Sequence, residues 1–311
     1  MYDGFLNVNK PSGMTSFDAV KIVLGEILDG KRPEKRLKLG HAGTLDPLAN
    51  GVLVMAVGRA SRLISRIQEQ KKTYVGTFQL GLSSPSEDTE TEMTPVENAR
   101  IPTRAEIEAV LPEFLGEILQ LPPIYSALKV NGQKAYDLAR KGKEVILKPR
   151  PIRIYTLEIV EYAYPSLTLK IQCGSGTYVR SLGRDLARRL GTEAVMSALT
   201  RTAIGGFRLE DALTIRTRTD TRPLDRPKCT EFIRPFLDAV PDLPRIAYNA
   251  EEIQKLKNGI PVTHLDAENL LPQEEAVVVD EMGKFLGIVR KERGALRSVL
   301  HFANENDRDF T

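Results

Sequence analysis

The sequence predicts an α+β fold, with a mixed, largely antiparallel central sheet, flanking helices and a small β-rich domain at the C-terminus. Two observations support this prediction. Strand-like apolar runs occur beside segments of helical spacing over most of the chain, and short strand patterns return near its end. The length of 311 residues suits two domains. We expect a larger domain over 1–243 and a smaller one over 244–311.

Strands and helices alternate in the first part of the chain. A strand is expected over Phe5–Val8 and a helix over Ser16–Leu28, with Ser16 as its N-cap. The apolar run Val52–Val57 is typical of a fully buried strand. We expect a helix over about Ser61–Gln68 and a strand over Thr73–Leu80.

The middle of the chain begins with a polar stretch. Residues 83–97 are rich in serine, threonine and acidic side chains, so we expect a mobile loop, and the sequence offers no packing signal there. A helix follows over Thr103–Leu111, capped by Thr103 with Glu106 three positions later. A tight turn at residues 131–132 leads to a short helix over Ala135–Lys141.

The second half combines an antiparallel pair of strands with a helix. The strands are expected over Ile152–Val160 and Leu167–Cys173. Apolar residues from Val179 to Leu190 follow helical spacing and stop at Gly191. Residues 239–244 are expected to be a linker, after which come a helix over 250–258 and a hairpin around 280–283.

The charge is locally clustered although the net charge is only +3 and the pI is near 8.7. Basic side chains gather in three places: Lys31–Lys38, Lys129–Arg153, and the set Arg180, Arg184, Arg188 and Arg189. A solvated face explains any one cluster more simply. Three clusters beside candidate site motifs indicate a polyanionic substrate.

Cysteine and histidine are too sparse for a metal site or a disulfide framework. The two cysteines lie far apart, and the histidines His41, His264 and His301 form no spaced pair. No signal peptide is recognisable, and no apolar stretch approaches the roughly 20 residues that span a bilayer. We expect a cytoplasmic protein.

Residues 40–53 form the most informative segment, because they place Asp46 in a turn rich in glycine. The following Pro47 disfavours helix at Asp46, and the three glycines of the segment permit sharp turns or close approach of another backbone. The simpler interpretation is that Asp46 and Pro47 only begin a turn. The complete string favours a carboxylate presented for chemistry.

Arg180 and Tyr74 are the other candidates. Arg180 lies in the first turn of the expected helix, where its charge opposes the helix dipole, so a carboxylate such as Asp46 is its expected partner. An exposed arginine with a modest penalty is an equally good interpretation of its position alone. Tyr74 follows two lysines, and by itself a half-buried aromatic explains it better.

The motifs resemble those of a known family when they are taken in order. They are residues 7–16, 40–53, 72–74, 122–129 and 176–182, which span most of the first 205 residues. In their amino-acid sequence and their order along the chain, these motifs resemble those of the TruB-type tRNA pseudouridine-55 synthases. The resemblance implies the pseudouridine synthase fold and a PUA-like RNA-binding domain over 244–311.

The resemblance also implies a reaction. Such enzymes isomerise one uridine in the T-arm loop of tRNA to pseudouridine, without cofactor or metal. It assigns Asp46 as the catalytic aspartate, Arg180 as its ion-pair partner and Tyr74 as the ring that stacks on uracil and helps to remove the C5 proton. Tyr178 and Leu199 would line the pocket. Whether Asp46 attacks C1′ or removes the C2′ proton stays open.

RNA contacts are implied as well. His41 would intrude into the loop that the flipped uridine leaves. The segment over about 120–150 would be a thumb over the RNA. Further substrate contacts are assigned to Lys10, Gly43, Thr44 and Lys129.

Some residues depart from the family pattern. Ala42, Thr200 and the polar excursion over 217–228 are unusual and bear on RNA affinity and the outer pocket. Alternative functions are a tRNA-folding chaperone, a guide-RNA-dependent synthase and, last, a carboxylate hydrolase, for which Asp46 lacks a paired carboxylate in any recognisable motif. We expect a monomer that needs no obligatory protein partner.

Overall fold

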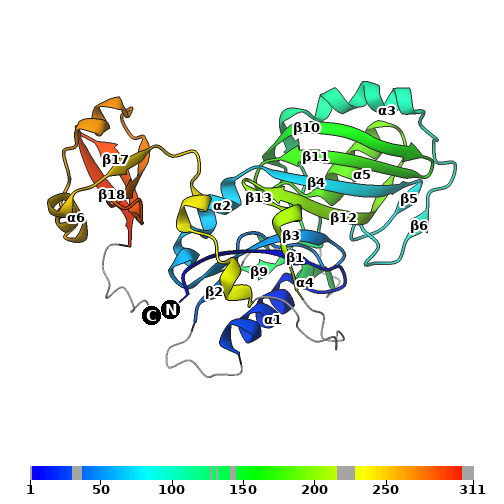
Figure 1. Ribbon diagram of the computed structural model, residues 1–311. Helices are drawn as coiled ribbons and strands as arrows, with labels where there is room; N and C mark the ends of the chain where they lie inside the picture. The colour runs from blue at the N-terminus through cyan, green and yellow to red at the C-terminus, as the bar shows by residue number, and fades with distance from the viewer. Residues whose placement is uncertain are drawn as a thin grey trace.

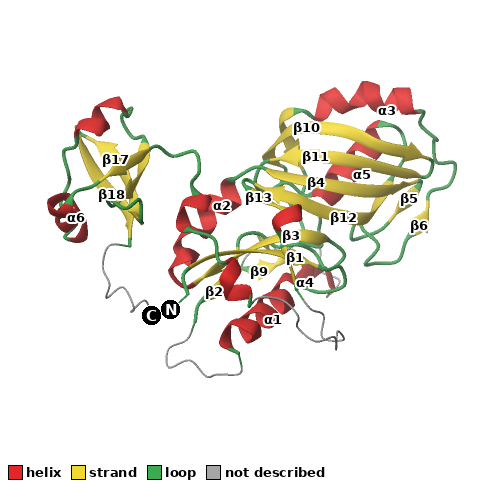
Figure 2. Cartoon of the chain, in the orientation of Figure 1, coloured by secondary structure: helices red, strands yellow, loops and turns green. Residues whose placement is uncertain are grey.

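The computed structural model describes residues 2–29, 37–126, 128–130, 132–140, 145–215 and 228–302. Within these ranges the chain forms a large ten-stranded sheet and, at the C-terminus, a separate four-stranded sheet (Figure 1). Helices lie around the large sheet, and the smaller sheet has its own short helix (Figure 2). The predicted α+β fold is confirmed.

The large sheet runs in the order β14-β1-β3-β12-β4-β11-β10-β7, with β13 beside β12 and β2 beside β3. Its strands are β1 (Gly4–Lys10), β2 (Leu39–His41), β3 (Asn50–Val57), β4 (Lys72–Leu80), β7 (Gly116–Gln120), β10 (Arg150–Ala163), β11 (Ser166–Cys173), β12 (Ala194–Ile204), β13 (Phe207–Arg208) and β14 (Leu213–Thr214). Among the described strands of this large sheet, only β1 with β14 and β3 with β12 pair in parallel. The sheet is therefore mixed and largely antiparallel, as expected.

The remaining strands form smaller units. The C-terminal sheet contains β15 (Arg245–Ala247), β16 (Glu275–Val279), β17 (Phe285–Glu292) and β18 (Ala295–His301), and two short ladders contain β5 (Leu82–Ser83) with β6 (Thr94–Pro95), and β8 (Lys129–Val130) with β9 (Gln133–Lys134). The expected hairpin around residues 280–283 is the β16–β17 pair, and it is confirmed.

The helices match the apolar periodicities in most places. The α-helices are α1 (Ser16–Leu28), α2 (Ile64–Glu69), α3 (Arg104–Val110), α4 (Ala135–Arg140), α5 (Val179–Arg189) and α6 (Ala250–Lys257). The 3₁₀ helices are η1 (Gly58–Leu63), η2 (Leu111–Phe114), η3 (Leu209–Asp211), η4 (Cys229–Phe232), η5 (Phe236–Ala239) and η6 (Leu265–Asn269). The predicted capping box of Thr103 and Glu106 is present at α3.

Two local predictions need correction. The N-cap of α1 is Thr15, whose hydroxyl accepts a hydrogen bond from the Asp18 N–H, because Ser16 is occupied elsewhere. The single helix expected over Ser61–Gln68 is a 3₁₀ turn, η1, followed by the short helix α2.

One face of the large sheet carries the main core. Apolar side chains of α1, α3 and α5 pack there against strands from β1 to β11; Val23, Ile107 and Leu186 represent the three helices. In Figure 1, α5 lies behind the strands and α1 lies beneath β1. The N-terminal ends of α1 and α5 thus lie on the same side of the sheet as the loop that carries Asp46.

A second core cluster joins the two sheets. Val277 and Phe302 of the C-terminal part lie in one cluster with Phe5 and Val54 of the large sheet. The Arg62 guanidinium donates to the His301 carbonyl at 2.8 Å, and other polar contacts cross the same interface. The expected linker at 239–244 is therefore packed at its start, where Ala239 and Val240 are buried. The domain boundary near residue 243 stays a prediction.

Some expectations cannot be compared with the structure. Most of the basic cluster Lys31–Lys38 and nearly all of the polar excursion over 217–228 lie outside the described residues. Within the described ranges, no helix has the length and apolar character needed to cross a membrane.

Candidate active site

Asp46 lies in the loop between β2 and β3, and neighbouring segments hold this loop on one side. The Ser16 hydroxyl donates to the Leu45 carbonyl at 3.0 Å and accepts from the Leu45 N–H at 2.9 Å. The Gly13 N–H donates to the Pro47 carbonyl at 2.8 Å. This reciprocal use of Ser16 explains why Thr15 caps α1 instead.

Arg201 of β12 holds the same loop from the other side. Its guanidinium is almost completely buried and donates to the carbonyls of Val52 at 2.7 Å, Gly43 at 3.0 Å and Thr44 at 3.5 Å. At Gly51, a Cβ would lie 2.3 Å from the Arg201 carbonyl oxygen, so only glycine allows β3 to approach β12 this closely. The predicted close backbone approach is confirmed at Gly51.

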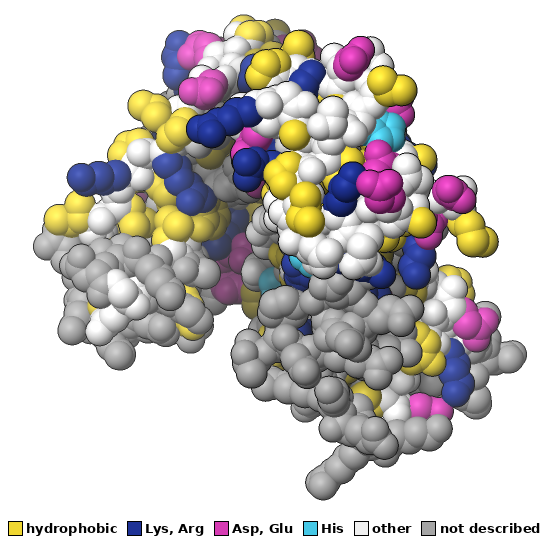
Figure 3. All heavy atoms as spheres, turned by 90° about the vertical axis from the view of Figure 1, so that its left-hand side faces the viewer, with side chains coloured by type: hydrophobic (Ala, Val, Ile, Leu, Met, Phe, Trp, Pro, Cys, Tyr) yellow, Lys and Arg dark blue, Asp and Glu magenta, His cyan; other side chains and the backbone are white. Residues whose placement is uncertain are grey.

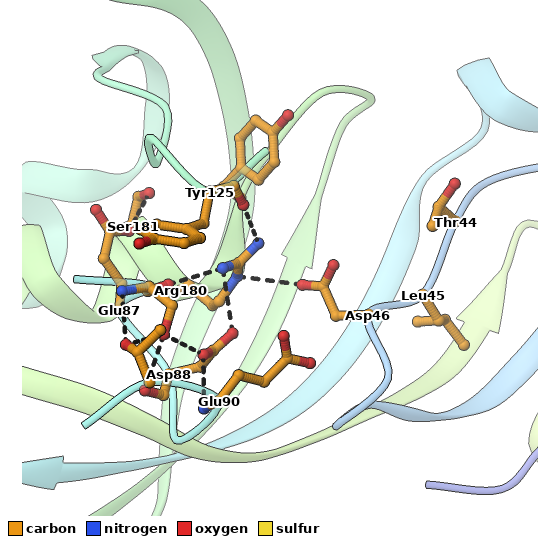
Figure 4. Close-up of polar contacts among 12 residues, drawn as sticks. Thr44, Leu45, Asp46, Glu87, Asp88, Glu90, Tyr125, Arg180 and Ser181 are labelled. Atoms are coloured by element: carbon orange, nitrogen blue, oxygen red, sulfur yellow. Dashed lines mark hydrogen bonds and ion pairs between the residues drawn. The ribbon is translucent and has the colours of Figure 1, made fainter. Parts of the chain in front are cut away.

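The predicted ion pair between Asp46 and Arg180 is present. Arg180 Nε lies 3.1 Å from Asp46 Oδ2, and the Asp46 carboxylate points toward the guanidinium (Figure 4). The Arg180 side chain is 6% exposed, whereas the Asp46 side chain is 37% exposed. One partner is therefore fixed inside the protein while the other keeps contact with solvent.

Arg180 has further partners in the acidic stretch that was expected to be a mobile loop. Its Nη1 lies 3.1 Å from Asp88 Oδ2 and donates to the Ser86 carbonyl at 2.7 Å. Asp88 is 1% exposed. The sequence offered no packing signal over residues 83–97, but Ser86, Glu87 and Asp88 pack against α5 and β12.

A third carboxylate belongs to the same neighbourhood. Glu90 points toward Asp46 in Figure 4, and burial, together with the charges of Asp88 and Asp46, raises the pKa of Glu90. The prediction that Asp46 lacks a paired carboxylate concerned sequence motifs, that is, positions along the chain. In space, Asp88 nevertheless shares Arg180 with Asp46.

Tyr74 and Leu199 form the apolar neighbourhood of the site. In the β4–β12 ladder Tyr74 lies opposite Arg201 and Leu199 lies opposite Gly76, so both side chains project from one face of the sheet. Both are buried, at 7% exposed each, and belong to the main core cluster. Burial raises the pKa of Tyr74, so its phenol is neutral at physiological pH.

His41 and Lys10 also lie near Asp46, but in different ways. Burial and the charge of Arg201 lower the pKa of His41, and its Nδ1 is buried without a hydrogen-bond partner. Lys10 is completely buried, and its Nζ donates to the carbonyls of Met14 at 2.7 Å and Pro11 at 3.0 Å. Lys10 therefore contacts the backbone beside the Asp46 loop, and no surface of it is open to a substrate.

The other predicted contacts lie at the borders of the site. Tyr178 precedes α5, with its N–H and carbonyl both bonded to the Gln120 amide, and its ring faces the Arg150 guanidinium at 4.9 Å. Thr44 points away from Arg180 in Figure 4. Lys129 begins β8, but its side chain lies outside the described atoms.

One face of the molecule is irregular and mixed in charge. Figure 3 shows a hollowed face, with basic, acidic and histidine side chains visible in the hollow. In the described part of the chain, no group of three histidine, cysteine or acidic side chains could hold a metal ion. Ala42, one of the unusual residues, is completely buried in the second core cluster, so its side chain cannot form part of an RNA surface.

Comparison with known proteins identifies the family. Residues 31–179 match the TruB family pseudouridylate synthase model for its N-terminal domain. A tRNA pseudouridine synthase B of Dehalococcoides mccartyi is 38% identical over 93% of this chain and 93% of its own length. The protein of the same name from Rhodopirellula baltica is 37% identical over 91% of this chain and 82% of its own.

Solved structures agree on the fold. The crystal structure of a Cbf5-Nop10-Gar1 complex contains a chain with a TM-score of 0.68 and 24% identity, covering 95% of this chain and 83% of that one. The family match and the named relatives define a pseudouridine synthase. The chain belongs to the TruB family of these enzymes.

Sequence reasoning missed several residues of the site. Asp88, Glu87 and Arg201 were not candidates, and Arg184 was interpreted as part of a solvated helix face. The signal for Arg184 was its spacing of four from Arg180, which places both on one face of α5. Both are buried, whereas Arg188 and Arg189 of the same helix are exposed and paired with Glu193 and Glu113.

Proposed function

We propose that this enzyme isomerises the uridine at position 55, in the T-arm loop of tRNA, to pseudouridine. The observation that carries the proposal is the Asp46–Arg180 ion pair, which holds a partly exposed carboxylate in a fixed place in the site. The relatives that cover most of this chain are named for action on tRNA. The chain acts alone, as a monomer.

Asp46 is the group that acts on the ribose. Whether it attacks C1′ or removes the C2′ proton, the step needs a carboxylate oriented toward the ribose, and the contact with Arg180 orients it. The detached uracil must then rotate without escaping, which the apolar side chains of Leu199 and Tyr74 beside the site favour. Because the pKa of Tyr74 is raised, its stacking surface is the main contribution we assign to it.

The remaining predicted residues bind or position the RNA. A neutral His41 fills the space that the flipped uridine leaves, and the basic residues over 31–38 and 129–150, Lys129 among them, contact phosphates. Tyr178 borders the pocket. Gly43 and Thr44 shape the Asp46 loop through their carbonyls, and Lys10 positions that loop rather than contacting RNA.

Mapping the modified nucleotide tests this proposal. An unmodified tRNA transcript is incubated with the enzyme, and pseudouridine is located by carbodiimide labelling and primer extension. We expect one labelled position, the T-loop uridine, and none in a transcript with cytidine there. Tight tRNA binding without modification would contradict the proposal and support the chaperone. Modification only with an added guide RNA would support the guide-dependent alternative.

A further inference from the structure

Helix α5 carries two buried arginines one turn apart, and both contact the same two segments of the chain. Arg180 donates to the carbonyls of Ser86 and Tyr125. Arg184 pairs with Glu87 and donates to the Leu121 carbonyl at 2.9 Å. The second arginine therefore repeats the connections of the first, one helical turn away from Asp46.

Glu87 is held in this arrangement from several directions. Its side chain is 11% exposed and contacts Arg184, which is 7% exposed, and it accepts a hydrogen bond from the Ser181 hydroxyl at 2.6 Å. Its carbonyl accepts from the Met196 N–H of β12 at 3.0 Å. The backbone of Glu87 has a φ of 64°, in the left-handed region that a glutamate rarely adopts. These contacts hold an unfavourable backbone conformation in place.

We propose that Glu87 and Arg184 are positioning residues for the catalytic ion pair. Neither contacts Asp46. Glu87 fixes the backbone next to Asp88, and Asp88 contacts the Nη1 of Arg180. Arg184 also fixes Leu121, at the start of the segment that ends at the Tyr125 carbonyl, another partner of Arg180. The pair thus sets the orientation in which Arg180 meets Asp46.

Charge balance supports the same assignment. Asp46 and Asp88 share the Arg180 guanidinium, and Glu87 has the Arg184 guanidinium beside it. Burial raises the pKa of Glu87, and the bonds from Ser181 and Arg184 act in the opposite direction. Without Arg184, Glu87 would be a buried carboxylate lacking its cation, and the most direct response is displacement of the loop that carries Asp88.

A comparison of single-turnover rates tests the inference, which rests on the proposed function. The variants are Arg184→Met and the isosteric Glu87→Gln, with Arg104→Met as the control because Arg104 is an exposed helix arginine paired with Glu108. Tritium release from tRNA containing 5-tritiated uridine is followed at saturating enzyme, well below each melting temperature. We expect both site variants to be at least about tenfold slower, with tRNA affinity within twofold of wild type.

Combination with Asp88→Asn distinguishes positioning from a merely structural role. If Glu87 acts through Asp88, the Glu87→Gln/Asp88→Asn double variant is about as slow as Asp88→Asn alone. Unchanged rates in folded Arg184→Met and Glu87→Gln, or rate losses that multiply in the double variant, would overturn the inference while leaving the function intact. An inactive wild-type enzyme would overturn both.

Discussion

The Nε of Arg180 lies 3.1 Å from the Oδ2 of Asp46, and the other two nitrogens of the guanidinium are bonded to the protein. Because Asp88 and the carbonyls of Ser86 and Tyr125 occupy Nη1 and Nη2, the Nε faces Asp46 in one fixed direction. The ion pair is therefore an oriented contact, and a positive charge alone would not reproduce it.

Replacement of Arg180 by lysine tests this orientation. Arg180→Lys keeps the charge but cannot bond to all these partners, so we expect the single-turnover rate to fall about 100-fold, equivalent to about 2.7 kcal/mol. The affinity for tRNA is expected to change little. A rate near that of wild type would show that charge alone is sufficient.

Arg201 is expected to stabilise the Asp46 loop and, with it, the whole fold. Arg201→Met leaves three carbonyls without their donor, and a buried unsatisfied group costs about 1–3 kcal/mol. We expect chemical denaturation to show a loss of at least about 3 kcal/mol in the free energy of unfolding. The control is Arg208→Met, because Arg208 is an exposed arginine on the adjacent strand β13. This variant should change the free energy of unfolding by less than about 0.5 kcal/mol. Equal losses in the two variants would contradict this role.

Activity is expected to fall as the pH rises through about 8 because of Lys10. Burial lowers the pKa of Lys10 to about 8. Below that pH the ammonium has three protons to donate to the carbonyls of Pro11, Met14 and Pro47, and above it the neutral amine has only two. The measurement is the single-turnover rate between pH 7 and 9.

Arginine variants separate Lys10 from a second buried lysine. The arginine of the Lys10→Arg variant stays protonated between pH 7 and 9. The fall of the single-turnover rate with pH should therefore disappear in that variant if it remains folded. Burial also lowers the pKa of Lys72 to about 8, but its Nζ contacts the carbonyls of Gln68 and Gln70, and Lys72→Arg should keep the wild-type profile. Identical profiles for Lys10→Arg and wild type would refute the assignment.

Replacement of two helical glycines by alanine should change the free energy of unfolding in opposite directions. At Gly183 of α5 a Cβ would lie 2.1 Å from the Phe78 ring, so Gly183→Ala should lower the free energy of unfolding by about 1–3 kcal/mol. Gly25 of α1 is exposed with nothing within 4 Å, and Gly25→Ala should raise it by about 0.5–1 kcal/mol. Chemical denaturation measures both. A stable Gly183→Ala variant would show that Phe78 moves aside at little cost.

The sequence predicted the parts of the site that depend on local rules. The buried strand β3, the glycine at its close approach to β12, and the position of Arg180 against the helix dipole each follow from neighbouring residues. The dipole argument left a carboxylate partner and an exposed arginine as equally good interpretations of Arg180, and the structure shows the carboxylate partner.

The parts that depend on distant partners could not be predicted in this way. Residues 86–88 are polar and resemble a solvated loop, and only the fold shows that α5 supplies arginines and a serine to bind them. Arg201 looked like an ordinary strand arginine, since its three carbonyl acceptors lie more than a hundred positions away along the chain. Serine is a common N-cap residue, but the hydroxyl of Ser16 is hydrogen-bonded to the backbone of Leu45.

The most direct test of the account is tritium release from tRNA containing 5-tritiated uridine, with wild type and Asp46→Asn measured side by side. The amide keeps the shape of the carboxylate but removes its charge, so tRNA binding should be retained. We predict release by wild type, from the T-loop uridine, and no release by Asp46→Asn. Release by Asp46→Asn at the wild-type rate would contradict the assignment of Asp46 as the catalytic carboxylate.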